Sequence, residues 1–165
     1  MTLGDIPPAS SVFVDANVFI YHFAGRSEQC SAFLARIEAG ELRGFTGRVT
    51  LLEVAHRLMV LEGIERGLKA GSNPAATLSG QPDLVRQLSK YYFSVRKITQ
   101  IGIEPLLLPA DFLEMSQEYR QRYGFLVNDS LIPLHMRKTG LSLLASADRA
   151  FDRLPWVRRA APTDV

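Results

Sequence analysis

Four carboxylate side chains of this sequence stand where a stretch of regular structure should end or begin. Asp15 interrupts the apolar run VFVDANVFI, and Glu53 lies in TLLEVAH. Asp129 follows in VNDSLIP, and Asp148 in SADRAF. An ionised carboxylate inside an apolar run is costly to bury unless something compensates its charge. Asp15 in particular should therefore have a partner.

A shared pocket for these carboxylates would favour one kind of chemistry. Carboxylates that converge raise each other's pKa unless a cation neutralises them. Oxygen donors without His or Cys favour a hard cation, Mg²⁺ or Mn²⁺, over zinc. Such a cation can bind phosphate oxygens, lower the pKa of a bound water and aid in-line attack at phosphorus. The set therefore predicts metal-assisted hydrolysis of a phosphodiester.

Each carboxylate also has a structural interpretation. Asp15 could cap the helix that follows it, and the spacing of Thr50 and Glu53 matches the capping-box pattern. Asp129 and Asp148 could cap helices or complement their dipoles. Capping would not require the four side chains to converge, so their joint pattern favours the metal pocket.

Alternating strands and helices should position these side chains. The residue patterns predict strands at 11–14, 42–46, 103–108, 141–145 and 157–160, helices at 16–23, 27–39, 50–61, 83–100, 109–123 and 128–138, and a loop at 63–80. This alternation predicts a three-layer α/β/α fold around a mostly parallel sheet. Ligands of such sheets bind beyond the carboxyl ends of the strands, which is where Asp15 and Asp148 should lie.

Length and composition set further bounds. The 165 residues, 47% of them hydrophobic and 22% charged, suit a single domain over 1–165, with an insertion or flap around 63–100. No apolar run approaches the roughly 20 residues needed to span a bilayer. The start of the chain lacks a signal-peptide pattern and Cys30 is the one cysteine, so we expect a cytoplasmic protein.

The basic residues leave two interpretations open. A net charge of +2 neither demands nor excludes nucleic acid. The late cluster of arginines is either solvated surface or a rim that faces phosphates; its members include Arg149, Arg153, Arg158 and Arg159. Tyr91, Tyr92 and Phe93 could likewise stack on RNA bases, or belong to a core or an interface.

Four stretches, taken in order, make the chain resemble the PIN-domain family, and in particular the toxin ribonucleases of VapBC-type toxin–antitoxin pairs. They are FVDANVFIY, VTLLEVAHRL, YGFLVNDSLIPLHMRKTG and LLASADRAFDRLP. Carried over by position, the resemblance implies that the metal-binding and catalytic acids are Asp15, Glu53, Asp129 and Asp148. It also implies a PIN-like fold, Mg²⁺- or Mn²⁺-dependent endoribonuclease activity, a homodimer, and a small antitoxin whose tail enters the acidic groove.

Three polar residues fall on supporting positions of that family. Asn17 matches a position that often supports the first aspartate, and Thr50 and Ser146 match small hydroxyl positions near the second and fourth acids. Thr50 could instead be only a helix cap. The region between Glu53 and Asp129 is longer than in compact toxins, which leaves the substrate and the toxin role open.

Alternative functions follow from the same residues. One is a PIN nuclease that is not a toxin, and another is a PIN scaffold that binds RNA or protein without cutting, against which the four intact acids argue. A phosphatase with Asp15 as its nucleophile would need a second aspartate two residues later, where this chain has Asn17. His22, His56 and His135 follow no metal-ligand spacing.

Overall fold

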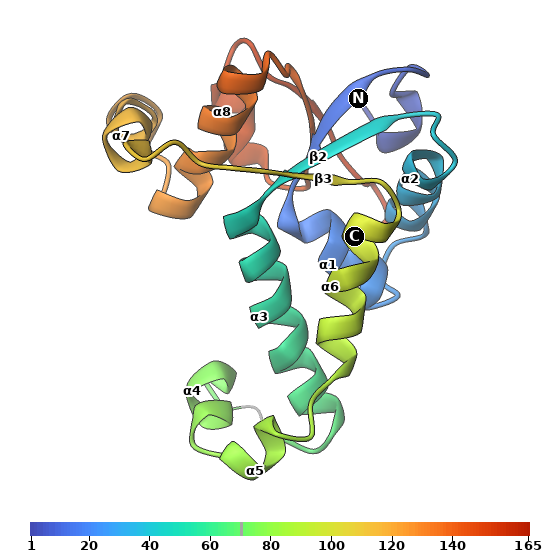
Figure 1. Cartoon of the computed structure of the whole chain (residues 1–165), viewed down its shortest axis with the longest axis vertical. Helices are drawn as coiled ribbons and strands as arrows, with labels where there is room; N and C mark the ends of the chain where they lie inside the picture. Colours follow the sequence, from blue (N-terminus) through green and yellow to red (C-terminus); the bar gives the residue numbers. More distant parts are fainter. Residues whose placement is uncertain (70) are drawn as a thin grey trace.

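A computed structural model of the protein describes residues 1–69 and 71–165 (Figure 1). Its core is a sheet of five strands in the order β3-β2-β1-β4-β5. The strands are β1 (Ser11–Val14), β2 (Arg43–Gly47), β3 (Glu104–Leu106), β4 (Leu143–Ala145) and β5 (Arg158–Ala160). All pairings between these strands are parallel, with Phe13 level with Phe45 on one side and Leu144 on the other. The predicted α/β fold with a parallel sheet is confirmed.

Helices cover both faces of the sheet (Figure 1). They are α1 (Ala16–Phe23), α2 (Glu28–Glu38), α3 (Arg48–Glu65), α4 (Pro74–Ser79), α5 (Pro82–Val85), α6 (Lys90–Gln100), α7 (Phe112–Tyr123) and α8 (Val127–Thr139), with 3₁₀ turns η1 (Leu3–Asp5) and η2 (Arg149–Arg153). None of the helices in the described residues is both long and apolar enough to cross a membrane.

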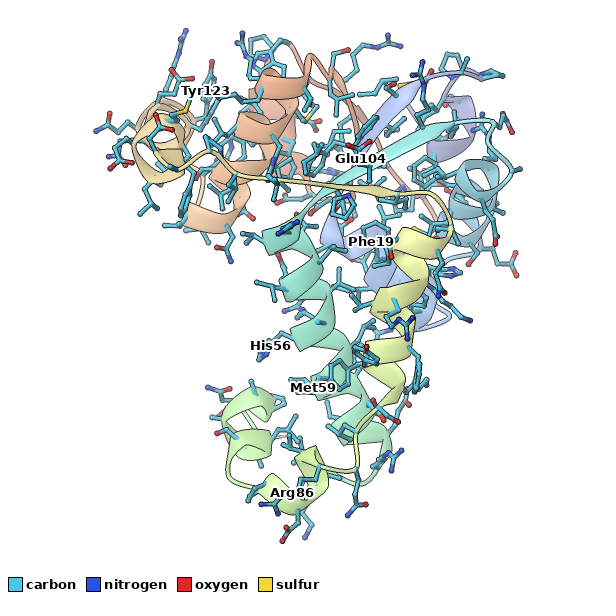
Figure 2. All side chains as sticks on the ribbon, viewed as in Figure 1. Phe19, His56, Met59, Arg86, Glu104 and Tyr123 are labelled. Atoms are coloured by element: carbon cyan, nitrogen blue, oxygen red, sulfur yellow. The ribbon has the colours of Figure 1, made fainter. Side chains whose placement is uncertain are left out.

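The central strand β1 shows why the sheet is buried on both sides. Successive side chains of a strand point to opposite faces. Val12 and Val14 pack in a core with α1, α2, α3 and α6, where Phe19 of α1 is fully buried (Figure 2). Phe13 packs in a second core with α7 and α8. Both faces are therefore apolar, and the strand appears in the sequence as a continuous apolar run.

The region 48–100 differs most from the prediction. Helix α3 continues to Glu65, past the predicted end at 61, and projects away from the sheet, while α6 lies beside it and returns toward the sheet (Figure 1). We call this projection, residues 56–98, the arm. The short helices α4 and α5 close its far end around Leu68, Leu78 and Leu88. The predictions of a loop over 63–80 and of one helix over 83–100 are wrong.

A buried carboxylate explains where α6 begins. Glu62 of α3 accepts hydrogen bonds from the backbone N–H groups of Ser89 and Tyr91, both at 3.0 Å. Burial acts to raise the pKa of Glu62, but these hydrogen bonds hold it below its usual value. They satisfy N–H groups that a helix start leaves unpaired. Glu62 therefore acts as a remote cap for α6 and joins the two long helices of the arm.

Candidate functional site

Asp15 lies at the carboxyl end of β1 and is 7% exposed. Its Oδ1 accepts a hydrogen bond from the Ala16 N–H at 2.7 Å, which makes it the N-cap of α1. Its Oδ2 accepts from Asn17 Nδ2 at 2.6 Å and from Ser146 Oγ at 2.7 Å. The cap interpretation is thus correct but accounts for only one of these three bonds. The bond from Ser146 joins residues 131 apart in the sequence.

Ser146 and Asn17 connect Asp15 to the segment that follows β4. The buried Ser146 hydroxyl accepts a hydrogen bond from the Asp148 N–H at 3.0 Å. Asn17 Oδ1 accepts from the Ala147 N–H at 3.0 Å. These contacts hold the carboxylate of Asp15 in one orientation. Asn17 was expected beside Asp15, whereas Ser146 was expected near Asp148 and contacts both acids.

Asp129 and Asp148 come from elements at the same edge of the sheet. Asp129 is half-buried in the first turn of α8, and the helix residue four positions later is Pro133, which has no N–H to donate to the Asp129 carbonyl. Asp148 is exposed and follows β4, where its Oδ1 caps η2 by accepting from the Ala150 N–H at 2.8 Å.

Glu53 and Thr50 are placed by the start of α3. This helix begins at Arg48 with Gly47 as its N-cap, and no side chain makes a capping hydrogen bond there. The capping-box interpretation of Thr50 and Glu53 is therefore wrong, because both lie inside the helix. Thr50 is buried and Glu53 is exposed. A structural role as a cap does not account for Glu53.

Charge interactions connect the four carboxylates. Burial raises the pKa of Asp15 to about 6, against the hydrogen bonds from Ser146 and Ala16, and the charges of Glu53 and Asp129 raise it further. Burial also raises the pKa of Asp129, and the charges of Asp148 and Glu53 add to that rise. The charges of Glu53 and Asp148 thus act on the two more buried acids, as carboxylates near one another do.

An open cavity of about 450 Å³ adjoins two of these acids, Glu53 and Asp129. It lies between α3 and α8 and is lined by Glu53, Leu126, Val127, Asn128 and Asp129. Its size is within the range of ligand sites. Leu126 and Val127 are exposed, so the acids have an apolar border on the α8 side. A substrate can reach Glu53 and Asp129 from solvent.

The donor set fits a hard divalent cation, which needs oxygen ligands. Over residues 1–69 and 71–165, no three His, Cys, Asp or Glu side chains are close enough to surround an ion directly. Mg²⁺ does not require that, because it keeps several waters and binds through one or two carboxylates. Asp15 and Asp129, whose pKa values are both raised, could hold it, with Glu53 and Asp148 able to interact through water.

Arg159 is a site residue that the sequence did not single out. Its Nη1 donates to the carbonyl oxygen of Ser146 at 3.0 Å, and its Nε and Nη2 donate to Asp152 at 2.7 and 2.9 Å. It therefore supports the segment that carries Ser146 and Asp148. The late arginine cluster was the available signal, but a count of basic residues does not show which of them turns toward the sheet.

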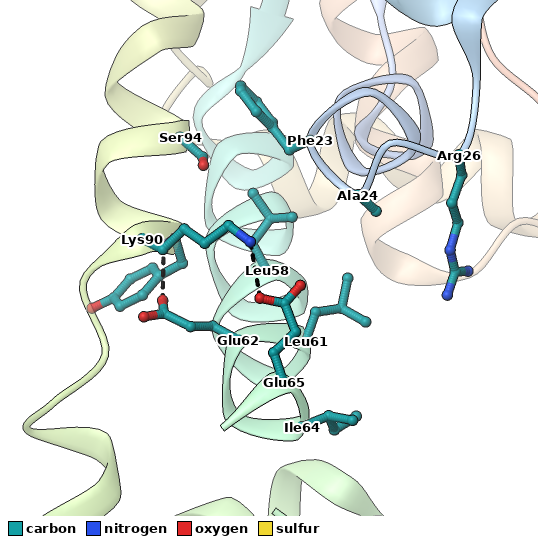
Figure 3. A pocket seen from close by; sticks show the side chains of 11 residues that line it. Phe23, Ala24, Arg26, Leu58, Leu61, Glu62, Ile64, Glu65, Lys90 and Ser94 are labelled. Atoms are coloured by element: carbon teal, nitrogen blue, oxygen red, sulfur yellow. Dashed lines mark hydrogen bonds and ion pairs between the residues drawn. The ribbon is translucent and has the colours of Figure 1, made fainter. Parts of the chain in front are cut away.

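A separate hollow of about 230 Å³ lies between α1, α3 and α6 (Figure 3). Phe23, Leu58 and Leu61 give it apolar walls. Two of its charged groups are already paired, since Lys90 Nζ lies 2.9 Å from Glu65 Oε2. Its lining includes none of the four carboxylates of the sheet edge. It belongs to the base of the arm.

Comparisons with known proteins identify the family and the fold. The model of the PIN domain family matches residues 12–157. The chain is 25% identical over 148 residues to Ribonuclease VapC2 of Methanocaldococcus jannaschii, covering 90% of this chain and 91% of that protein. Its fold is similar to a chain in the crystal structure of VapBC2 from Rickettsia felis bound to a DNA fragment from their promoter. There the TM-score is 0.56 at 13% identity, over 92% of this chain and 98% of the other. Because the family model spans most of the chain, including all four carboxylates, the chain belongs to the PIN-domain family.

Proposed function

We propose that the protein is an endoribonuclease that hydrolyses RNA phosphodiester bonds with Mg²⁺ or Mn²⁺, and that it is the toxin of a VapBC-type pair. One observation carries the proposal: at the carboxyl edge of the sheet, burial raises the pKa values of Asp15 and Asp129, and the charges of neighbouring carboxylates raise them further. Such repulsion is costly, and a bound cation would relieve it. The relative named a ribonuclease supports the choice of RNA.

The residues of the chain would divide the work as follows. A divalent cation, when bound, supplies positive charge next to the phosphate and a more acidic water. Asp15 is held by Ser146 and Asn17, so it offers a fixed carboxylate on the buried side. Asp129 is half-buried and lines the open cavity, so it could hold the same cation from the side that faces solvent. Glu53 and Asp148 are exposed and face the incoming strand.

The partners are part of the same proposal. The similar structure from Rickettsia felis is that of VapBC2, and the relative from Methanocaldococcus jannaschii is a VapC, which supports a small antitoxin as the inhibitor. The resemblance supports a homodimer, and the single cysteine supports a cytoplasmic location. The alternatives are a PIN nuclease outside any toxin–antitoxin pair and a scaffold that binds RNA or protein without cutting. Co-expression with the product of the adjacent reading frame, followed by co-purification and inhibition assays, separates the first alternative from the toxin.

Cleavage of single-stranded or looped RNA tests the catalytic proposal. We expect cleavage with Mg²⁺ or Mn²⁺, loss of cleavage in excess EDTA, and loss by at least about a hundredfold in Asp15→Asn and Asp129→Asn. Asp83→Asn is the matched control, because the Asp83 side chain is 89% exposed and lies in the arm. Equal cleavage in EDTA, or by Asp129→Asn, would rule out the mechanism.

A further inference from the structure

A second cavity adjoins the acidic site through Ala147. It has a volume of about 480 Å³ and lies between α1, the segment after β4 and the chain around β5. Its lining includes Tyr21, Ala147, Arg149, Arg159, Ala161 and Thr163. In the sequence Ala147 lies between Ser146, which binds Asp15, and Asp148. The two sites therefore share a wall, which we call the 146–148 segment.

Hydrogen bonds fix that shared wall from two sides. On one side, the Ala147 N–H donates to Asn17 Oδ1 at 3.0 Å. On the other, Arg159 Nη1 donates to the Ser146 carbonyl oxygen at 3.0 Å. Tyr21 lies four residues after Asn17 on α1, so both are on one face of that helix. The aromatic ring that borders the cavity is thus held in register with the residue that orients Asp15.

The two arginines of this cavity differ in how their charges are used. Arg159 is 13% exposed and bidentate to Asp152, so its charge is largely compensated. Arg149 is exposed and forms no ion pair with a side chain in the described part of the chain. A guanidinium without a carboxylate partner is available to a phosphate, which it can bind with two parallel hydrogen bonds.

We propose that this cavity holds one nucleotide of the RNA strand, next to the phosphate that is cleaved, with its base on Tyr21 and its phosphate at Arg149. Aromatic rings stack on any base, and a cation beside the ring binds the backbone, which is the usual composition of a single-strand site. The cavity volume suits a ligand of nucleotide size. An acidic peptide would use Arg149 but would gain little from the ring, so RNA is the better match.

This inference rests on the proposed ribonuclease function, and it adds a direction to it. The acids alone do not say on which side of the cleaved bond the strand is held. The cavity places a binding contact beside the 146–148 segment, whereas the other cavity lies between α3 and α8, where Leu126 and Val127 border it, and the two share no lining residue. The strand should therefore be bound on both sides of the cleaved phosphate.

Binding of RNA that is not cut tests the cavity directly. The full chain carrying Asp129→Asn is titrated into a fluorescein-labelled single-stranded oligoribonucleotide of mixed sequence, and fluorescence anisotropy is followed. Arg149→Gln should weaken binding on the order of tenfold and lower the slope of log K against log salt by about 0.7. The control is Arg158→Gln, an exposed arginine of β5 outside the cavity, which loses the same charge and should change affinity by less than about threefold.

Tyr21 has its own pair of variants. Tyr21→Phe keeps the ring and should bind RNA as tightly as the parent, whereas Tyr21→Leu should bind on the order of tenfold more weakly. Since Tyr21 is partly buried against the core, thermal unfolding must show that the leucine variant is folded. If the phenylalanine variant loses affinity as much as the leucine variant does, stacking is not the contact and the proposal is overturned.

Kinetics distinguish failure of the cavity from failure of the function. In the active protein, Arg149→Gln should raise KM about tenfold and leave kcat within about twofold, because the contact binds the ground state and the transition state alike. If Arg149→Gln and Arg158→Gln are equal in binding and in KM while RNA is still cleaved, the cavity proposal is wrong and the function stands. If no RNA is cleaved but Arg149→Gln alone weakens binding, the cavity stands and the proposed hydrolysis fails.

Discussion

Replacing Asp15 by asparagine should make the protein more stable at neutral pH while it removes activity. The folded-state pKa of Asp15 is about 6, raised by burial from the usual 3.8. The folded protein therefore binds the Asp15 proton more tightly than the unfolded chain does. The stability that this provides is complete below about pH 3.8 and is lost as pH rises to about 6. The shift corresponds to a loss of about 3 kcal/mol.

An asparagine at this position avoids that loss. A neutral amide has nearly the shape of a protonated carboxyl group, but the surroundings of Asp15 present mainly donors: the Ala16 N–H, Asn17 Nδ2 and Ser146 Oγ. One amide hydrogen would face a donor, which costs about 1 kcal/mol. We expect Asp15→Asn to be about 2 kcal/mol more stable than the parent at about pH 7.5 and about 1 kcal/mol less stable at about pH 4.

Urea unfolding in EDTA, followed by circular dichroism at both pH values, measures this difference. The m-value should be unchanged, so that the shift in midpoint reports stability alone. Adding Mg²⁺ or Mn²⁺ should stabilise the parent and not the variant, because only the native pocket of the parent binds the cation. If the difference in unfolding free energy between parent and variant has the same sign and size at both pH values, ionisation of Asp15 does not destabilise the folded protein. That result would contradict the raised pKa on which the site is argued.

Three further outcomes follow from individual contacts. Ser146→Ala should destabilise the protein by about 1–3 kcal/mol and reduce cleavage at least about tenfold, measured by urea unfolding and RNA hydrolysis, because its hydroxyl binds Asp15 Oδ2; unchanged activity would contradict a supporting role. Gly47→Ala should cost about 1–3 kcal/mol in the same unfolding assay, since the added Cβ would lie 2.8 Å from His135 Nε2, whereas Gly71→Ala meets no atom within 4 Å and should be nearly neutral. Burial lowers the pKa of His135 to about 4, so the stability that the neutral ring provides is present above about pH 6.5 and is lost as pH falls to about 4. NMR titration should show a neutral His135 ring at about pH 5, and a titration midpoint near 6.5 would contradict the burial of the ring.

The order of strands and helices, and the sheet edge that carries the acids, could be predicted from the sequence. The apolar strands at 11–14 and 141–145 and the helix at 27–39 lie within a few residues of β1, β4 and α2. Their residue patterns are local and strongly periodic, and Asp15 and Asp148 follow their strands directly. The edge of a parallel sheet then brings such residues together whatever the details of the connections.

The parts that could not be predicted depend on partners that are distant in sequence. The break between α5 and α6 is stabilised by Glu62, which caps α6 from a different helix; within 83–100 the local signal is Ser89, the N-cap residue, whose side chain makes no capping hydrogen bond. The start of α3 at Arg48 has no capping side chain, so the sequence pattern placed the start of this helix at Thr50, two residues too late. Ser146 binds Asp15 through its hydroxyl, and Arg159 binds the carbonyl oxygen of Ser146. Both contacts depend on the register between β1, β4 and β5.

The place of β4 in the sheet has a consequence for synthesis of the protein. This strand lies beside the central strand β1, yet it is made more than a hundred residues later, and it brings Ser146 and Asp148 with it. A chain still attached to the ribosome before β4 has emerged lacks one acid and the hydroxyl that orients another. Pairing at such separation is also slow to form. A nuclease built in this way would be inert through most of its own translation, so that an inhibitor made in the same cell has time to bind before the site is complete.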